Sequence, residues 1–149
     1  MPTVPARLTV AARVLLPVYL VALGFIVFAP SDDATKVTGI VALAAKALGV
    51  LQIPFEPAYV ALEFLANIAL FVPFGILVRL VWKRARWWMI LALGLLTTIT
   101  IELTQLALPT RYSTLSDVIA NTLGTAVGLV LVWFVLLRVR DRAFGALPG

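Results

Sequence analysis

The chain has 149 residues, of which 62% are hydrophobic and 13% are charged, and its net charge is +5. A water-soluble domain of this size carries about 25% charged residues, so the composition excludes an ordinary soluble fold and indicates an integral membrane protein. The chain contains no cysteine and no histidine, which excludes disulfides, thiol nucleophiles, imidazole bases and metal sites built from either residue. The basic residues lie beside apolar runs, a pattern that indicates membrane orientation and no nucleic-acid partner.

The first apolar run follows two arginines and predicts a transmembrane helix over residues 11–30. A cleaved signal peptide is the alternative, because Val27 and Ala29 suit a cleavage site. Pro30 would then directly follow the cut, which is an unfavourable position. We therefore expect this helix to be retained as the first membrane span.

The next segment, residues 36–53, is apolar but carries Lys46 within it. A lysine at the centre of a lone spanning helix costs about 2.5–3.5 kcal/mol, and the segment is also short. We therefore predict an interfacial or re-entrant helix here, with a fifth membrane span as the alternative.

Three further apolar runs predict membrane spans over residues 58–79, 87–108 and 115–137. Together with the first span they predict an all-α fold, a polytopic membrane bundle of four transmembrane helices plus the interfacial helix. The sequence contains no long linker, so we expect residues 1–149 to form a single domain.

The charges predict which way the bundle faces. With both termini in the cytoplasm, the cytoplasmic side holds nine of the twelve basic residues, as the positive-inside rule requires: Arg7, Arg13, Arg79, Lys83, Arg84, Arg86, Arg138, Arg140 and Arg142. Six of the seven acidic residues fall on the outer side or on the span ends that face it: Asp32, Asp33, Glu56, Glu63, Glu102 and Asp117. We therefore expect a multi-pass protein of the cell membrane with both termini cytoplasmic.

Polar side chains recur at similar depth near the outer ends of the last three predicted spans. The pairs are Glu63 with Asn67, Glu102 with Gln105, and Asp117 with Asn121. Members of a pair are three or four residues apart, so they share a helix face. We expect all six to line one pocket open toward the outer surface, with Arg111 in the last loop closing over it. Interhelical hydrogen bonds are the alternative for the three amides, whereas carboxylates within a membrane typically mark ligand or ion pathways.

Other features of the spans predict packing. Gly124 and Gly128 form a G-x-x-x-G pattern, which lets helices approach closely. Pro73 lies within a predicted span and should kink it. Four threonines of the third span are expected to bond back to their own helix: Thr97, Thr98, Thr100 and Thr104.

Three motifs in order resemble those of VanZ-like membrane proteins. Residues 67–75 (NIALFVPFG) resemble the N-x-x-x-F-x-P-x-G signature, residues 102–105 (ELTQ) the E-x-x-Q motif, and Arg111 with residues 117–124 (DVIANTLG) the block R…D-x-x-x-N-x-x-G. The resemblance covers roughly residues 63–128. It implies a role at the cell envelope, because the family is named for a member linked to teicoplanin resistance, and glycopeptides act on lipid-linked wall precursors outside the membrane.

The first functional hypothesis is an enzyme that acts on the head group of an envelope lipid or lipid-linked wall precursor. The residues assigned to catalysis are Glu63, Glu102, Asp117 and Arg111, and those assigned to substrate binding are Asn67, Gln105, Asn121 and again Arg111. Three acids face one arginine, so either one acid is protonated and acts as general acid or a cation joins the site. An all-oxygen donor set suits Mg²⁺ or Ca²⁺, and Arg111 would clamp a phosphate or carboxylate.

Two other hypotheses remain open. A non-catalytic protein that binds or masks a lipid precursor or an antibiotic needs the same pocket without turnover. A small transporter needs a polar path across the membrane, and the inner halves of the predicted spans carry almost no polar residues.

Overall fold

The computed structural model describes residues 4–28, 31–49, 52–107 and 114–145. The elements in this part of the chain are five helices and no strands. They are α1 (Ala6–Phe28), α2 (Ser31–Leu48), α3 (Phe55–Val81), α4 (Trp87–Leu106) and α5 (Leu115–Gly145). The all-α fold predicted from the sequence is confirmed.

Four of these helices are long and apolar enough to cross a membrane: α1, α3, α4 and the part of α5 from Leu115 to Arg138. The four predicted spans are therefore confirmed, with ends displaced by a few residues. The helix α1 begins at Ala6, five residues before the predicted start, and α5 continues seven residues beyond the apolar part to Gly145. The chain is a multi-pass membrane protein.

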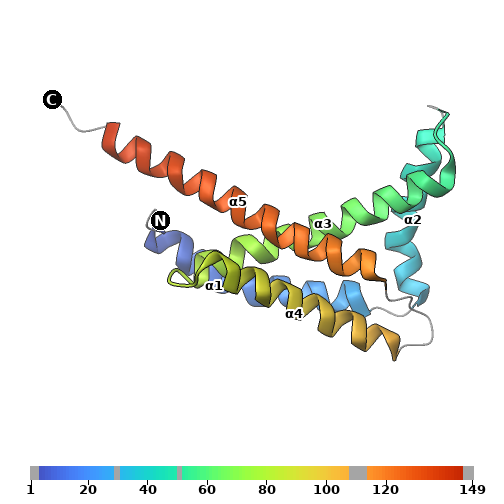
Figure 1. Ribbon diagram of the computed structural model, residues 1–149, viewed down its shortest axis with the longest axis horizontal. Coiled ribbons are helices and arrows are strands. Elements are labelled where there is room, and N and C mark those ends of the chain that lie inside the picture. The colour runs from blue at the N-terminus through green and yellow to red at the C-terminus, as the bar shows by residue number, and fades with distance from the viewer. Residues whose placement is uncertain (1–3, 29–30, 50–51, 108–113, 146–149) are drawn as a thin grey trace.

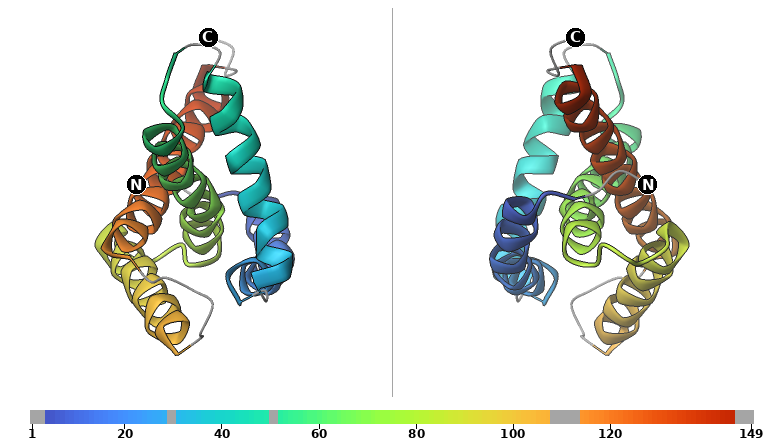
Figure 2. Two further views of the ribbon diagram at one scale, coloured as in Figure 1. Left: turned by 90° about the vertical axis from the view of Figure 1, so that its right-hand side faces the viewer. Right: turned by 90° about the vertical axis from the view of Figure 1, so that its left-hand side faces the viewer.

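Helix α2 runs roughly crosswise to the other helices at one end of the bundle, from the end of α1 to the start of α3 (Figures 1 and 2). Its apolar part, Gly39–Leu48, is shorter than the four spanning helices. The helix as a whole begins at Ser31, five residues before the predicted start of the segment. The transverse orientation is the one expected of the interfacial helix that the sequence predicts.

Helices α3 and α5 cross at the centre of the bundle, and glycines let their backbones meet there (Figure 1). A Cβ atom added to Gly124 would clash with the carbonyl oxygen of Ile68, and one added to Gly75 would clash with that of Thr125. Gly128 is equally crowded by the α3 backbone. The predicted G-x-x-x-G packing is confirmed, since only a residue without a Cβ fits these positions.

Helix α1 packs against α3 and belongs to the same core. Its Leu23 and Val27 are buried in one apolar cluster with Phe71 and Phe74 of α3. The hydroxyl of Tyr19 donates a hydrogen bond of 2.9 Å to the carbonyl oxygen of Leu70. An interhelical bond of this kind replaces the water that a phenol would otherwise require.

The charged residues separate toward the two ends of this bundle. One end holds the start of α1, the α3–α4 turn and the end of α5 (Figure 1). We call it the basic end, since it carries Arg7, Arg13, Lys83, Arg84, Arg86 and Arg138. The opposite end, which we call the polar end, holds the end of α4 and the start of α5, and α2 lies at the same end beside α3.

Candidate functional site

The polar end is organised around the first turn of α5. Thr114 precedes the helix, and its hydroxyl accepts the backbone N–H of Asp117 at 3.1 Å while donating to Asp117 Oδ2 at 2.7 Å. Threonine is favoured at this capping position because it satisfies an N–H that the helix leaves unpaired. A carboxylate in the first turn is also stabilised by the helix dipole. The start of α5 thus fixes the orientation of Asp117.

Asp117 also connects α5 to α3. The amide of Asn67 donates from Nδ2 to Asp117 Oδ1 at 2.5 Å. Both carboxylate oxygens therefore accept hydrogen bonds, one from α3 and one from the cap of α5. Asn67 and Asp117 belong to two different motifs quoted above, and the fold brings them into contact.

The backbone of Thr114 extends the site to α4. Its N–H donates to Glu102 Oε2 at 3.2 Å, and Glu102 is buried with 6% of its surface exposed. In a usual capping box the acid of the first turn accepts this N–H, but here an acid of another helix does so. Asn67, Asp117, Thr114 and Glu102 thus form one chain of hydrogen bonds across three helices, which we call the polar network.

Glu63 lies one helical turn before Asn67 on α3, and its side chain is exposed. Its carboxylate and that of Asp117 carry like charges and repel each other. Three carboxylates, those of Glu63, Glu102 and Asp117, are therefore grouped around the start of α5. This end of the bundle presents negative charge and hydrogen-bond acceptors.

The two remaining amides of the predicted site have other partners. Gln105 donates from Nε2 to the carbonyl oxygen of Val27 at 3.0 Å, one of the last carbonyls of α1, which the helix itself leaves unpaired. Asn121 donates from Nδ2 to the hydroxyl of Thr98 on α4 at 2.9 Å. These contacts are the interhelical hydrogen bonds that the sequence offers as the alternative for the amides. A role for either residue in ligand binding stays a prediction.

One atom of Asn121 has no partner among the described residues. Its Oδ1 is buried and accepts no hydrogen bond there, while its backbone carbonyl accepts the hydroxyl of Thr125 at 3.1 Å. Buried amide oxygens normally have partners. This oxygen lies one helical turn beyond Asp117 on α5.

Thr114 caps α5, a role not predicted from the sequence, and the prediction made for Thr98 is wrong. The spacing Thr114-x-x-Asp117 is the signature of a capping box, so Thr114 was detectable. Thr98 was expected to bond back to its own helix, but its hydroxyl accepts from Asn121. The other three threonines do bond back to carbonyls one turn earlier on α4: Thr97, Thr100 and Thr104. Arg111, predicted to close the site, lies outside the described residues.

The residues that the structure describes include no group of three acidic side chains placed to hold a metal ion. Asp117 already accepts hydrogen bonds on both oxygens, so its lone pairs are shared with protein donors. A hard cation such as Mg²⁺ or Ca²⁺ needs several oxygen ligands turned toward one point. The described side chains do not make that arrangement.

An open apolar cavity adjoins the start of α5. Its volume is about 630 Å³, and it lies between α3 and Ser116. Its walls are largely apolar, with Val60, Phe64 and Leu65 among them. The lining also includes Glu56, and it contains no residue of the polar network.

Comparison with protein-family models finds a match over residues 16–137 to the family described as VanZ/LLP1. The match extends well beyond the three motifs and includes most of α1 and all of α2. Comparisons with curated proteins and with solved structures find no match.

Proposed function

We propose, from the premise that this chain belongs to the VanZ/LLP1 family, that it binds or acts on the polar head group of an envelope lipid or lipid-linked cell-wall precursor. The observation that carries this proposal is the polar network, in which Asn67, Asp117 and Glu102 from three helices are joined at one end of the bundle. Membrane helices rarely gather carboxylates without a ligand or ion to recognise.

The chemistry of the network favours a ligand that donates hydrogen bonds. Carboxylate oxygens accept hydrogen bonds and attract positive charge, and Glu63 adds a third negative group beside Asp117. Sugar hydroxyls and amines are donors of this kind, and they occur in the head groups of envelope lipids and wall precursors. The apolar cavity beside Ser116 supplies a place for the hydrocarbon chain of the same molecule.

The proposed orientation puts the polar end outside the cell. The basic end carries most of the arginines and lysines, and such residues stay in the cytoplasm. The chain has no cysteine, so a single cysteine can report its side. We expect an impermeant thiol reagent to label Ser116→Cys in intact cells and to spare Arg84→Cys, and the opposite labelling would place the network inside the cell.

A link to teicoplanin-type resistance, which the resemblance implies, would follow from the proposed orientation. Glycopeptides meet lipid-linked wall precursors on the outer face of the membrane. A protein that holds or alters the precursor head group there changes the amount of target that the antibiotic finds.

The direct test is retention of lipid by the purified protein. We expect native mass spectrometry in mild detergent to detect a head-group-bearing lipid on the wild-type protein. The double variant Glu102→Gln/Asp117→Asn keeps the shapes of both side chains but removes both charges, and it should retain at least tenfold less. Thr100→Val/Thr104→Val is the matched control, because both residues are exposed and bond only to their own helix. Equal retention by both double variants would exclude the network as the binding site.

The same preparation separates an enzyme from a non-catalytic binder. Incubating the wild-type protein with the lipid it retains and following the head group by mass spectrometry reports turnover. A released or altered head group that the Glu102→Gln/Asp117→Asn variant fails to produce identifies an enzyme. A lipid that is retained and unchanged identifies a protein that masks or presents it.

A further inference from the structure

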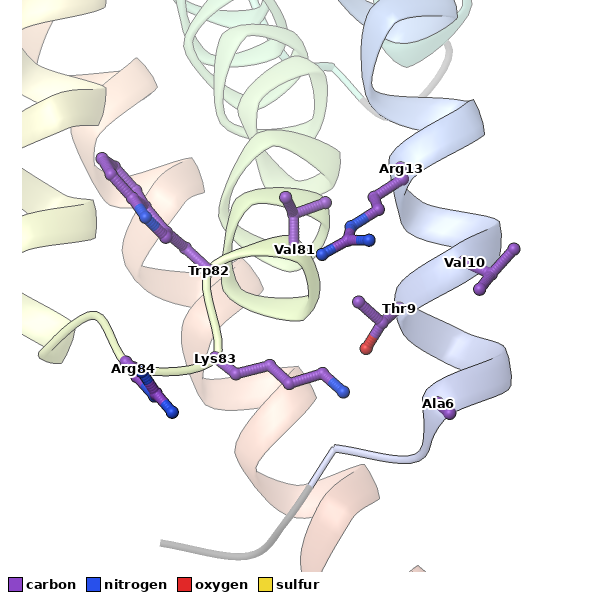
Figure 3. Close-up of a pocket in the computed structure, with 8 residues that line it drawn as sticks. All are labelled: Ala6, Thr9, Val10, Arg13, Val81, Trp82, Lys83 and Arg84. Atoms are coloured by element: carbon purple, nitrogen blue, oxygen red, sulfur yellow. The ribbon is translucent and has the colours of Figure 1, made fainter.

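A second cavity lies at the basic end, between α1 and the turn that joins α3 to α4 (Figure 3). Its volume is about 460 Å³. Helix α1 contributes Thr9, Val10 and Arg13 to its lining, and the turn contributes Trp82 and Lys83. The cavity shares no residue with the polar network and lies at the opposite end of the bundle.

Positive charge converges on this cavity. Arg13 and Lys83 extend into the space between α1 and the end of α3 from opposite sides (Figure 3). Arg84 also belongs to the lining. The acidic residues whose side chains the structure describes lie on the far halves of their helices, at Glu56, Glu63, Glu102 and Asp117. The cavity therefore combines cations from two elements, and the lining residues that the structure describes include no carboxylate.

The turn that carries Lys83 is held in place by a buried arginine. Arg79, in the last turn of α3, donates from one guanidinium nitrogen to the carbonyl oxygen of Lys83 at 2.9 Å and to that of Trp82 at 3.4 Å. Only 7% of the Arg79 surface is exposed. A cation at the end of a helix stabilises carbonyls that the helix leaves unpaired. The position of Lys83 relative to α1 is thus set by the fold.

The apolar part of the lining places the cavity at the level of the membrane. Val10 is 61% exposed on the side of a spanning helix that faces away from the bundle, where lipid chains would cover it. Trp82 is 53% exposed at the end of α3, and tryptophan is enriched where head groups meet hydrocarbon. A soluble anion would use the cations of this cavity but leave its apolar wall unused, whereas a lipid uses both.

We propose that this cavity binds the phosphate group of an anionic membrane lipid. Arg13 offers a planar pair of N–H donors to two phosphate oxygens, Lys83 adds a second charge, and the acyl chain lies along Val10 and Val81. Basic pockets between membrane helices bind anionic head groups in this way. The site is independent of the polar network, which presents the opposite charge and favours hydrogen-bond donors.

The test titrates the detergent-purified full-length chain with phosphatidylglycerol and measures bound lipid by native mass spectrometry. The variant Arg13→Gln/Lys83→Gln should bind roughly thirtyfold more weakly than wild type, since each basic residue contributes about a factor of five to anionic lipid binding. The matched control is Arg7→Gln/Arg86→Gln, which removes the same charge from α1 and the same turn but lies outside the cavity. The control should bind within about twofold of wild type, because neither residue lines the cavity and solvent-exposed charges outside it are screened by salt.

Three outcomes would overturn the proposal. Equal weakening by both double variants would mean that net charge alone attracts the lipid. Equal binding of phosphatidylcholine, whose phosphate charge is balanced by choline, would show that the cavity does not select a net negative head group. Complete displacement by millimolar inorganic phosphate would remove the role of the lipid chain. The single variants Arg13→Gln and Lys83→Gln, both at exposed positions, repeat the test if the double variant fails to fold.

Discussion

The charged side chains at the two ends of the bundle differ in burial and in hydrogen bonding. At the polar end, Asp117 and Glu102 accept hydrogen bonds from other parts of the fold, and Glu102 is buried. At the basic end, Arg13 and Lys83 are exposed and line an open cavity. A charge taken out of water must be compensated by partners, whereas an exposed charge costs little. We conclude that changes at the polar end should affect stability and binding together, and changes at the basic end should affect binding alone.

The largest effect is expected at the crossing that separates the two ends. Gly124→Ala places a methyl group against the carbonyl oxygen of Ile68 and must push α3 away from α5. We expect the free energy of unfolding to fall by about 3 kcal/mol, which corresponds to roughly 6–12 °C in melting temperature. Gly24→Ala is the control, because a methyl group there meets open space. Similar melting temperatures for the two variants would show that the crossing is looser than described.

The next effect tests the polar end itself. Asp117→Ala removes the acceptor of both Asn67 and the Thr114 hydroxyl, so we expect the free energy of unfolding to fall by about 2 kcal/mol. Thermal unfolding in detergent measures it, with the exposed neighbour Ser116→Ala as reference. An unchanged melting temperature would mean that Asp117 is solvated and contributes nothing to the cohesion of α3 with α5.

A smaller effect on stability is expected at Gln105, an amide that bonds between helices outside the polar network. Gln105→Leu removes the hydrogen bond to the carbonyl oxygen of Val27, and bonds of this kind between membrane helices contribute about 0.6 kcal/mol each. We expect a slightly lower melting temperature and unchanged retention of the lipid bound at the polar end. Loss of that lipid, measured as for Glu102→Gln/Asp117→Asn, would instead assign Gln105 to the binding site, as the sequence predicts.

The smallest effect on stability is expected at the basic end. Lys83→Gln removes an exposed charge, so the free energy of unfolding should change by less than about 0.5 kcal/mol. The difference from Asp117→Ala in the free energy of unfolding measures how much more the charged side chain at the polar end contributes to stability. A destabilisation as large as that of Asp117→Ala would show that the Lys83 side chain has a structural partner. It would contradict the conclusion that charges at the basic end do not contribute to stability.

The sequence by itself determined the features that depend on local composition. Apolar runs of sufficient length predict four spans because a membrane-spanning helix must satisfy its own backbone and present apolar side chains to lipid. The shortness of the apolar part of α2 and its Lys46 favour an interfacial or re-entrant helix over a fifth span on the same grounds. The three motifs sufficed to indicate the family that the comparison confirms over residues 16–137. The Gly124–Gly128 spacing predicted close packing because a missing Cβ has the same consequence wherever the partner helix lies.

Only the tertiary structure decided which polar groups meet. Gln105 and Glu102 share a helix face, yet one bonds to Val27, 78 residues away, and the other to the backbone of Thr114. The cavity between Arg13 and Lys83 likewise exists only because α1 lies beside the α3–α4 turn. Spacing along one helix fixes the direction of a side chain relative to its own axis. The partner depends on how each helix is rotated and where it crosses its neighbours, and contacts such as that between Gly124 and the backbone of Ile68 set those two quantities.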